Sequence, residues 1–162
     1  LVLALTAYML FKNVLLKSGH SLIREKHSKI QMRIYCLDAD GNTAYETREF
    51  SGGSTLLDDI KTAVEETGVR TSKGNVVNAV PAGVKVRNIF LDDKNCVYID
   101  FDKTLVSSHA GGSKGELDTL NCIKNTLTYN FRDIEFVKLL VEGKELQTIA
   151  GHINTAGKLN LK

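Results

Sequence analysis

The feature that most restricts the fold is an alternation between pairs of strand-like segments and two helix-like segments. The clearest pair is Val84–Leu91 and Cys96–Phe101, joined by the turn sequence Asp92-Asp93-Lys94-Asn95. In the second segment Val, Ile and Phe alternate with Tyr and Asp, which is the two-residue period of a strand. We therefore expect a β-hairpin at residues 84–101.

Other strand-like segments lie at both ends of the domain. Residues 32–37 and Ala44–Phe50 form a pair around a polar turn at Asp38–Asn42. Ile134–Val141 is apolar on both faces, which is typical of a central strand covered on two sides. A short last strand, Glu145–Ile149, is expected to follow it.

Two segments have the 3.6-residue period of amphipathic helices. The first follows Ser54, a candidate N-cap, and ends at Gly68. The second starts at Ser113, which forms with Glu116 a capping-box sequence, in which each side chain binds a free backbone N–H of the helix start. The residues expected to face the core are Leu56, Leu57, Ile60 and Val64 in the first helix, and Leu117, Leu120, Ile123 and Leu127 in the second.

The element order is therefore β-β-α-β-β-α-β-β. We expect an α+β domain at residues 29–162, with two helices packed on a mainly antiparallel sheet. The 162 residues are enough for one domain with a substantial core. With 43% hydrophobic and 25% charged residues, the composition is that of an ordinary globular protein.

Residues 1–28 are expected to form a hydrophobic anchor helix and a basic linker. Leu1–Phe11 carries no charge, and after Lys12 the apolar character resumes as far as Leu16. Spanning a bilayer takes about 20 apolar residues, so we interpret Leu1–Leu16 as the carboxyl-terminal part of a signal anchor whose upstream residues are missing. The alternative is an amphipathic helix on the domain or in the membrane interface. Basic residues follow the segment, so its orientation stays open.

The charge of the chain does not favour a polyanionic partner. There are 21 Lys and Arg against 19 Asp and Glu, and five of the basic residues but only one acidic residue lie between Lys12 and Lys29. The remainder has 16 basic and 18 acidic residues. Nucleic-acid binding by the domain is therefore not expected.

The three cysteines do not have the spacing of a metal site. Cys36 and Cys96 fall in apolar strand patterns and Cys122 falls in a helix. We interpret all three as buried thiols that act as small apolar side chains. A disulfide between Cys36 and Cys96 stays open, because the sequence does not give the distance between them.

Several short motifs follow one another from Val80 onward. They are the turn with Pro81 and Gly83, the strand end Asp100-Phe101, the small-residue loop Gly111-Gly112-Ser113 with Glu116, Val141-Glu142-Gly143-Lys144, and the closing Gly151-His152-Ile153. In this order they resemble the GerMN domain of bacterial sporulation and germination proteins. The earlier IYCLDADG resembles the opening strand of that family more weakly, so the resemblance covers about residues 31–155. Asn154 departs from it, since an aspartate is common there.

The resemblance implies a fold similar to the ring-building motifs of secretion-type assemblies, which pack side by side. It also implies a domain without known catalytic machinery, found in lipoproteins or membrane-anchored proteins that face away from the cytoplasm. We therefore expect a non-enzymatic, membrane-anchored protein of the periplasm or cell envelope, without cofactor or metal. Its expected partners are copies of itself or other envelope assembly proteins. Binding of peptidoglycan or another glycan is the alternative.

The loop before the second helix also contains residue types that could do chemistry. Its serines could supply a nucleophile, its histidine a base and its glycines a backbone cradle for an anion. The residues concerned are Ser107, Ser108, His109, Gly111, Gly112 and Ser113. The capping box explains Ser113, and close approach of the backbone at a helix start explains the paired glycines. We therefore assign no catalytic residue and treat the loop as a possible ligand or interface loop.

Two acidic groups have an ordinary structural explanation. Asp38, Asp40, Asn42 and Glu49 resemble a calcium loop, but Thr43 stands where the required glycine should be, so a polar hairpin turn is expected. The carboxylates at residues 100 and 102 could form a pair, but a solvated strand end is expected instead.

His152 lies in the closing Gly-His-Ile motif. Since no partner ligand has suitable spacing, we expect a structural histidine rather than a metal ligand.

Overall fold

The first of two β-sheets is antiparallel and is built on one long hairpin. The computed structural model describes residues 28–70 and 76–162. The strands of this sheet lie in the order β2-β1-β3, where β1 is Lys29–Asp38, β2 is Thr43–Ser51 and β3 is Val76–Val77. Met32, Ile34 and Cys36 are buried, as their alternation predicts.

The second sheet contains the predicted hairpin. Its order is β4-β5-β6-β7, with β8 also paired to β6; the strands are β4 (Val86–Leu91), β5 (Cys96–Phe101), β6 (Phe136–Val141), β7 (Lys144–Glu145) and β8 (Leu159–Asn160). The hairpin is confirmed, with Ile89 opposite Ile99. The strands β5 and β6 are parallel, and the other strand pairs found in the described residues are antiparallel.

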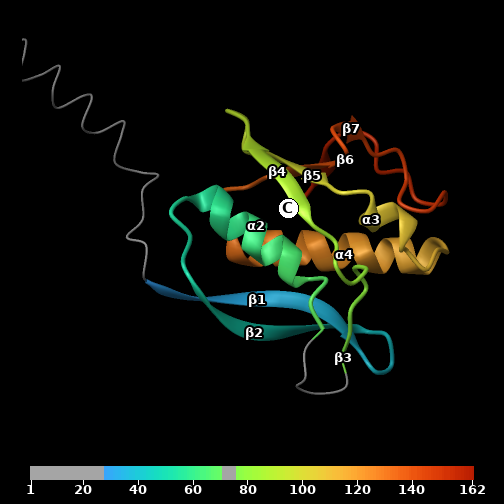
Figure 1. Cartoon of the computed structure of the whole chain (residues 1–162), viewed down its shortest axis with the longest axis horizontal. Coiled ribbons are helices and arrows are strands. Elements are labelled where there is room, and N and C mark those ends of the chain that lie inside the picture. Colours follow the sequence, from blue (N-terminus) through green and yellow to red (C-terminus); the bar gives the residue numbers. More distant parts are fainter. Residues whose placement is uncertain (1–27, 71–75) are drawn as a thin grey trace, which may run out of the picture.

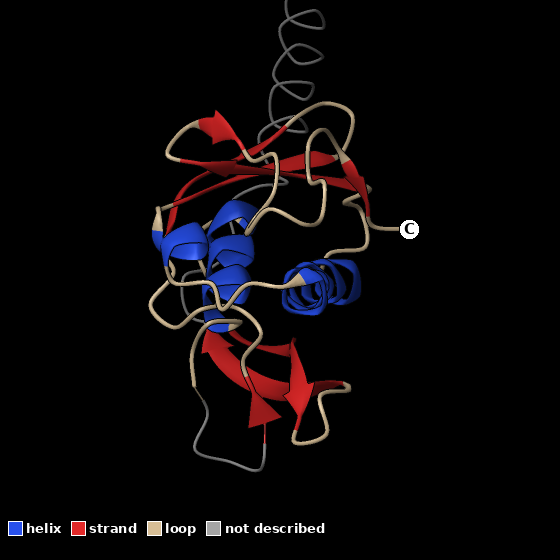
Figure 2. Cartoon of the chain, turned by 90° about the vertical axis from the view of Figure 1, so that its right-hand side faces the viewer, coloured by secondary structure: helices blue, strands red, loops and turns tan. Residues whose placement is uncertain are grey.

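The helices lie between the two sheets (Figures 1 and 2). They are α2 (Leu56–Glu66), the short α3 (Thr104–Ser107) and α4 (Ser113–Asn130). The helix α4 packs against β1 and α2, and α2 also contacts β4. The α+β class is therefore confirmed, but the single sheet that we expected is wrong, because sheets cover both sides of the helical layer.

The core lies on the inner faces of these layers, and most of the predicted core residues reach it. Ile60, Val64, Leu120, Ile123 and Leu127 are all buried. The exception is at the start of α4, where Leu117 is 48% exposed, so the prediction for this residue is wrong.

The strand β6 is not covered on both faces, contrary to the prediction. Val137 and Leu139 are buried, whereas Phe136, Lys138 and Leu140, which alternate with them, remain partly accessible. The expected last strand at residues 145–149 is reduced to the two residues of β7. The short elements β3, α3 and β8 were not predicted.

The expected anchor falls almost wholly on residues that the structure does not describe. Residues 1–27 lie outside the described ranges, so the anchor and the boundary at residue 29 stay predictions. Within residues 28–70 and 76–162, no helix combines the length and the apolar character needed to cross a bilayer.

Both helix starts differ from the predicted ones. The N-cap of α2 is Thr55 rather than Ser54: its hydroxyl accepts from the Asp58 N–H at 3.2 Å, and the Asp58 carboxylate accepts from the Thr55 N–H at 2.9 Å. The N-cap of α4 is Gly112, with φ +81°, and no side chain caps it. Ser113 is the first helical residue, so the predicted capping box at Ser113 is wrong.

These caps give a paired prediction. Thr55→Ala should lower the free energy of unfolding by about 1 kcal/mol, since it leaves the Asp58 N–H at the helix start without a side-chain acceptor. Ser113→Ala should change the free energy of unfolding by less than about 0.5 kcal/mol, because this hydroxyl caps nothing. Urea unfolding of both variants tests the pair. An equal loss in Ser113→Ala would show that the serine does cap α4.

Candidate functional site

Glu116, in the first turn of α4, binds the carboxyl-terminal loop through hydrogen bonds to its carboxylate. Its side chain is fully buried. Its carboxylate accepts hydrogen bonds from the backbone N–H groups of Ile149 at 3.2 Å, His152 at 2.8 Å and Ile153 at 3.2 Å. The His152 ring adds a contact of 2.9 Å from Nδ1 to Oε1. The two family-like motifs at residues 111–116 and 151–153 therefore meet at one carboxylate.

These donors determine the charge state of Glu116. Burial alone would raise the pKa of this carboxyl, since it disfavours the charged form. The backbone N–H groups of Ile153, Ala150 and His152, together with the His152 side chain, outweigh burial and lower the pKa to about 2. Glu116 is therefore a buried, ionised structural anchor, and His152 is its partner.

A second buried carboxylate fixes the turn after β6. Asp100 is 4% exposed and accepts from the Gly143 N–H at 2.8 Å. Gly143 has φ +79°, a conformation that favours glycine. The expectation of a solvated strand end is therefore wrong for Asp100. Asp102 binds other groups, the Lys85 N–H and the Thr104 hydroxyl, so the two carboxylates do not share a site.

Both ring nitrogens of His109 are occupied. Nδ1 accepts from the Gly111 N–H at 3.0 Å, and Nε2 lies 3.0 Å from the Thr119 hydroxyl oxygen. An N–H group can only donate, so the proton of the neutral ring sits on Nε2 and points to Thr119. The Thr119 hydroxyl in turn donates to the carbonyl oxygen of Ala79 at 2.7 Å. His109 therefore links the loop to α4 and to the segment before Pro81.

The rest of this loop does not assemble into a catalytic group. Ser107 and Ser108 are exposed, and neither hydroxyl hydrogen-bonds His109 within the described ranges. Gly111 and Gly112 have φ of +85° and +81°, and a Cβ atom on either would meet open space. They are needed for backbone conformation, so the close approach that we expected there is wrong.

The remaining chemical candidates have structural partners. Asp38 accepts from the N–H groups of Asp40 and Asn42, which makes the predicted polar turn. Glu49 lies 2.6 Å from the Lys29 ammonium group. Across residues 28–70 and 76–162, no group of three or more His, Cys, Asp or Glu side chains could hold a metal ion.

The cysteines are buried thiols, as predicted. Cys36, Cys96 and Cys122 are all free. The disulfide left open between Cys36 and Cys96 is absent, since these residues lie in strands of different sheets. Burial raises the pKa of the Cys122 thiol to about 12, so this group stays protonated and unreactive.

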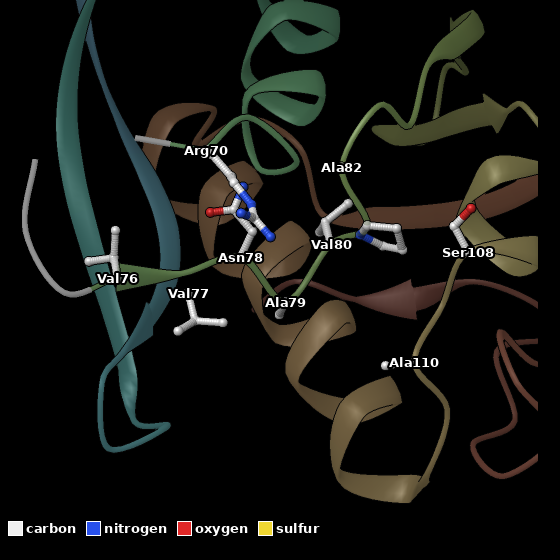
Figure 3. A pocket seen from close by; sticks show the side chains of 10 residues that line it. Arg70, Val76, Val77, Asn78, Ala79, Val80, Ala82, Ser108 and Ala110 are labelled. Carbon is white, nitrogen blue, oxygen red and sulfur yellow. The ribbon is translucent and has the colours of Figure 1, made fainter. Parts of the chain in front are cut away.

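A cavity of about 530 Å³ opens beside the loop that precedes α4 (Figure 3). It is bounded by the segment between β3 and β4 on one side and by the loop on the other. Its lining comprises Arg70, Val76, Val77, Asn78, Ala79, Val80, Pro81, Ala82, Ser108 and Ala110. Two predicted site residues, Pro81 and Ser108, therefore share a cavity, whereas Gly83 is exposed and outside its lining.

Two residues of this cavity were missed by the sequence analysis. The Nδ2 atom of Asn78 is buried, and it is the one such side-chain atom without a hydrogen-bond partner in the described part of the chain. Arg70 lies in the same lining. No local motif marks either residue, because the cavity depends on the approach of two distant segments.

The sequence matches a known family over most of its length. Residues 33–147 match Germane, described as sporulation and spore germination. The chain belongs to the Germane family. The matched residues include Glu116 and Gly143. The match ends before residues 149–153, the loop whose backbone N–H groups bind the Glu116 carboxylate.

Solved GerMN domains share the fold. The first GerMN domain of the sporulation protein GerM from Bacillus subtilis has a TM-score of 0.67 and 20% identity, over 81% of this chain and 97% of that one. The tandem GerMN domains of the same protein have a TM-score of 0.67 and 19% identity, over 82% of this chain and 46% of that one. This chain thus spans about half of the tandem-domain structure.

A further relative comes from another organism. A protein of Clostridium perfringens, assigned as a lipoprotein, has a TM-score of 0.56 and 16% identity, over 82% of this chain and 87% of that one. No curated protein matches significantly. At these identities the solved structures establish a common fold, and function has to be argued from the molecule.

Proposed function

We propose that this Germane domain is a non-enzymatic envelope module, held at the membrane, that packs laterally with copies of itself or with another envelope protein. The main observation behind this proposal is the exposed apolar end of β4. Phe90 is 61% exposed and Leu91 is 38% exposed. In its sheet β4 pairs with β5 alone, so its outer edge has no neighbouring strand in the described structure.

The two ends of this edge differ. At the start of β4, the Val86 N–H donates to the Glu65 carboxylate at 2.9 Å, which closes that position to another strand. The other end presents Phe90 and Leu91 without such a cover, and the hairpin reaches the periphery of the molecule (Figure 1). Exposed apolar edge strands pair readily with other chains, and proteins usually protect them. An edge left open in this way suits addition of a partner.

Other features support the envelope location and the absence of catalysis. The uncharged segment Leu1–Phe11 suits an anchor, and one relative is assigned as a lipoprotein. Both nitrogens of His109 serve structural hydrogen bonds, so the loop offers no free base. The ring-building-like fold that the family resemblance implies would fit the same role, since such modules act by packing side by side. Peptidoglycan binding at residues 105–113 is the second candidate, since a cavity lies beside Ser108.

The proposal predicts that a charge at the open edge weakens association. Phe90→Lys in the full chain should reduce self-association by about tenfold or more, which corresponds to about 1.4 kcal/mol. Sedimentation velocity in detergent, over a range of protein concentrations, measures this change. The matched control is Leu117→Lys, which changes another exposed apolar residue, on α4. If wild type and Phe90→Lys associated equally strongly, β4 would not be the self-association surface.

A further inference from the structure

We infer that the cavity beside Pro81 binds a small carboxylate-bearing ligand, with Asn78 and Arg70 as its recognition groups. The site is separate from the β4 edge, and the inference does not rest on lateral packing. Its volume of about 530 Å³ lies within the range usual for small-molecule sites.

The first argument is the buried amide of Asn78. Its Nδ2 atom has no hydrogen-bond partner, although the side chain lines the cavity (Figure 3). Buried polar atoms are almost always paired, because an unpaired donor loses its hydration without compensation. An unpaired donor in the wall of a cavity therefore indicates an acceptor that comes from outside the chain.

The second argument is the charge next to this donor. Arg70 lines the same cavity and has no acidic partner among the described residues. A guanidinium group binds carboxylates through two parallel N–H···O bonds. Among the described residues, neither Asp nor Glu lines the cavity, so no acidic side chain of that part of the wall competes for Arg70. A carboxylate satisfies both the Arg70 charge and the Asn78 donor.

The other lining residues suggest the rest of the ligand. Ala79, Ala82 and Ala110 are small, and Val80 and Pro81 add apolar surface. The described part of the lining contains no aromatic side chain on which a sugar ring could stack. The cavity therefore suits a short peptide carboxylate with small apolar side chains better than a sugar.

The test uses the ¹⁵N-labelled full chain in detergent and the probe N-acetyl-Ala-Ala with a free carboxylate. Titration should shift the backbone amide signals of residues 76–80, 82 and 108–110, and the same dipeptide with an amidated end should bind at least about tenfold more weakly. Arg70→Gln should also weaken binding by about tenfold. Arg132→Gln, an exposed arginine outside the cavity lining, is the matched control and should bind as wild type does.

The Asn78→Leu variant separates recognition from a structural role. It should lose binding while unfolding at the same urea concentration as wild type or a higher one, because it removes a buried donor that has no partner. A chain that shows no shifts with millimolar dipeptide would overturn the inference. So would equal binding of the amidated probe, or an Asn78→Leu chain that binds normally.

Discussion

Glu116→Gln should lower the free energy of unfolding at pH 7 by about 3–5 kcal/mol, which is large for a side chain of almost unchanged size. The substituted amide presents an NH₂ group to a nest of backbone N–H donors from Ile149, His152 and Ile153. At least one donor then loses its acceptor in a site that water does not reach. Chemical denaturation of the full chain measures the loss.

The pH dependence identifies the carboxylate as the cause. The Glu116 pKa falls from 4.5 to about 2 on folding, so the charged form favours the folded state. This contribution, roughly 3 kcal/mol, is fully present above pH 4.5 and is lost as the pH falls from 4.5 towards 2. The difference in stability between wild type and Glu116→Gln should therefore shrink across this window.

The matched control is a carboxylate of the same kind in an exposed pair. Glu49→Gln breaks a solvent-exposed contact with Lys29 and should cost less than about 1 kcal/mol. If Glu116→Gln were as mild as Glu49→Gln, and its stability ran parallel to that of wild type from pH 5 to pH 2, Glu116 would not anchor the loop.

Phe101→Ala should destabilise the chain by about 3–5 kcal/mol. Phe101 is fully buried at the end of β5 and is the largest of the fully buried side chains in the described residues. Its removal leaves a cavity between the second sheet and the helical layer, which the neighbouring strands cannot close without breaking their pairing. The midpoint of urea unfolding reports the change.

The neighbouring strand supplies the control for this prediction. Phe90→Ala removes the same ring from a position that is 61% exposed and should cost less than about 1 kcal/mol. Equal losses in the two variants would mean that the inner and outer faces of the second sheet are assigned wrongly.

Local sequence patterns predicted several elements and core residues well. The alternation at residues 96–101 gave the bounds of β5, and the helical stripe placed Leu120, Ile123 and Leu127 in the core. Leu117 was assigned to this stripe but is exposed, because the buried position in the first turn of α4 is Glu116, which the carboxyl-terminal loop covers. A pattern of apolar residues does not reveal a buried carboxylate on the same helix face.

The pairing of strands was beyond these patterns. The sequence of the hairpin at residues 29–51 does not indicate that this hairpin forms a sheet of its own on the far side of α4. The parallel pairing of β5 with β6 follows from the helical crossover between them, but its place in a second sheet depends on long-range packing.

The candidate site was predicted only in part for the same reason. The resemblance singled out Glu116 and His152, but the expected capping box used the Glu116 carboxylate at the start of its own helix. In the structure that carboxylate binds residues 33 to 37 positions further along the chain. Asn78 carries no sequence signal, since an unpaired amide is a property of the assembled cavity.

Site-specific photo-cross-linking in intact membranes tests lateral packing most directly. A photoreactive residue in place of Phe90, on the open edge of β4, should capture a second copy or one defined envelope protein. The same residue in place of Leu117, also exposed but on α4, should capture neither. Lateral packing through β4 predicts a discrete product at position 90 alone. The absence of any product at position 90, or the same products at both positions, would contradict it.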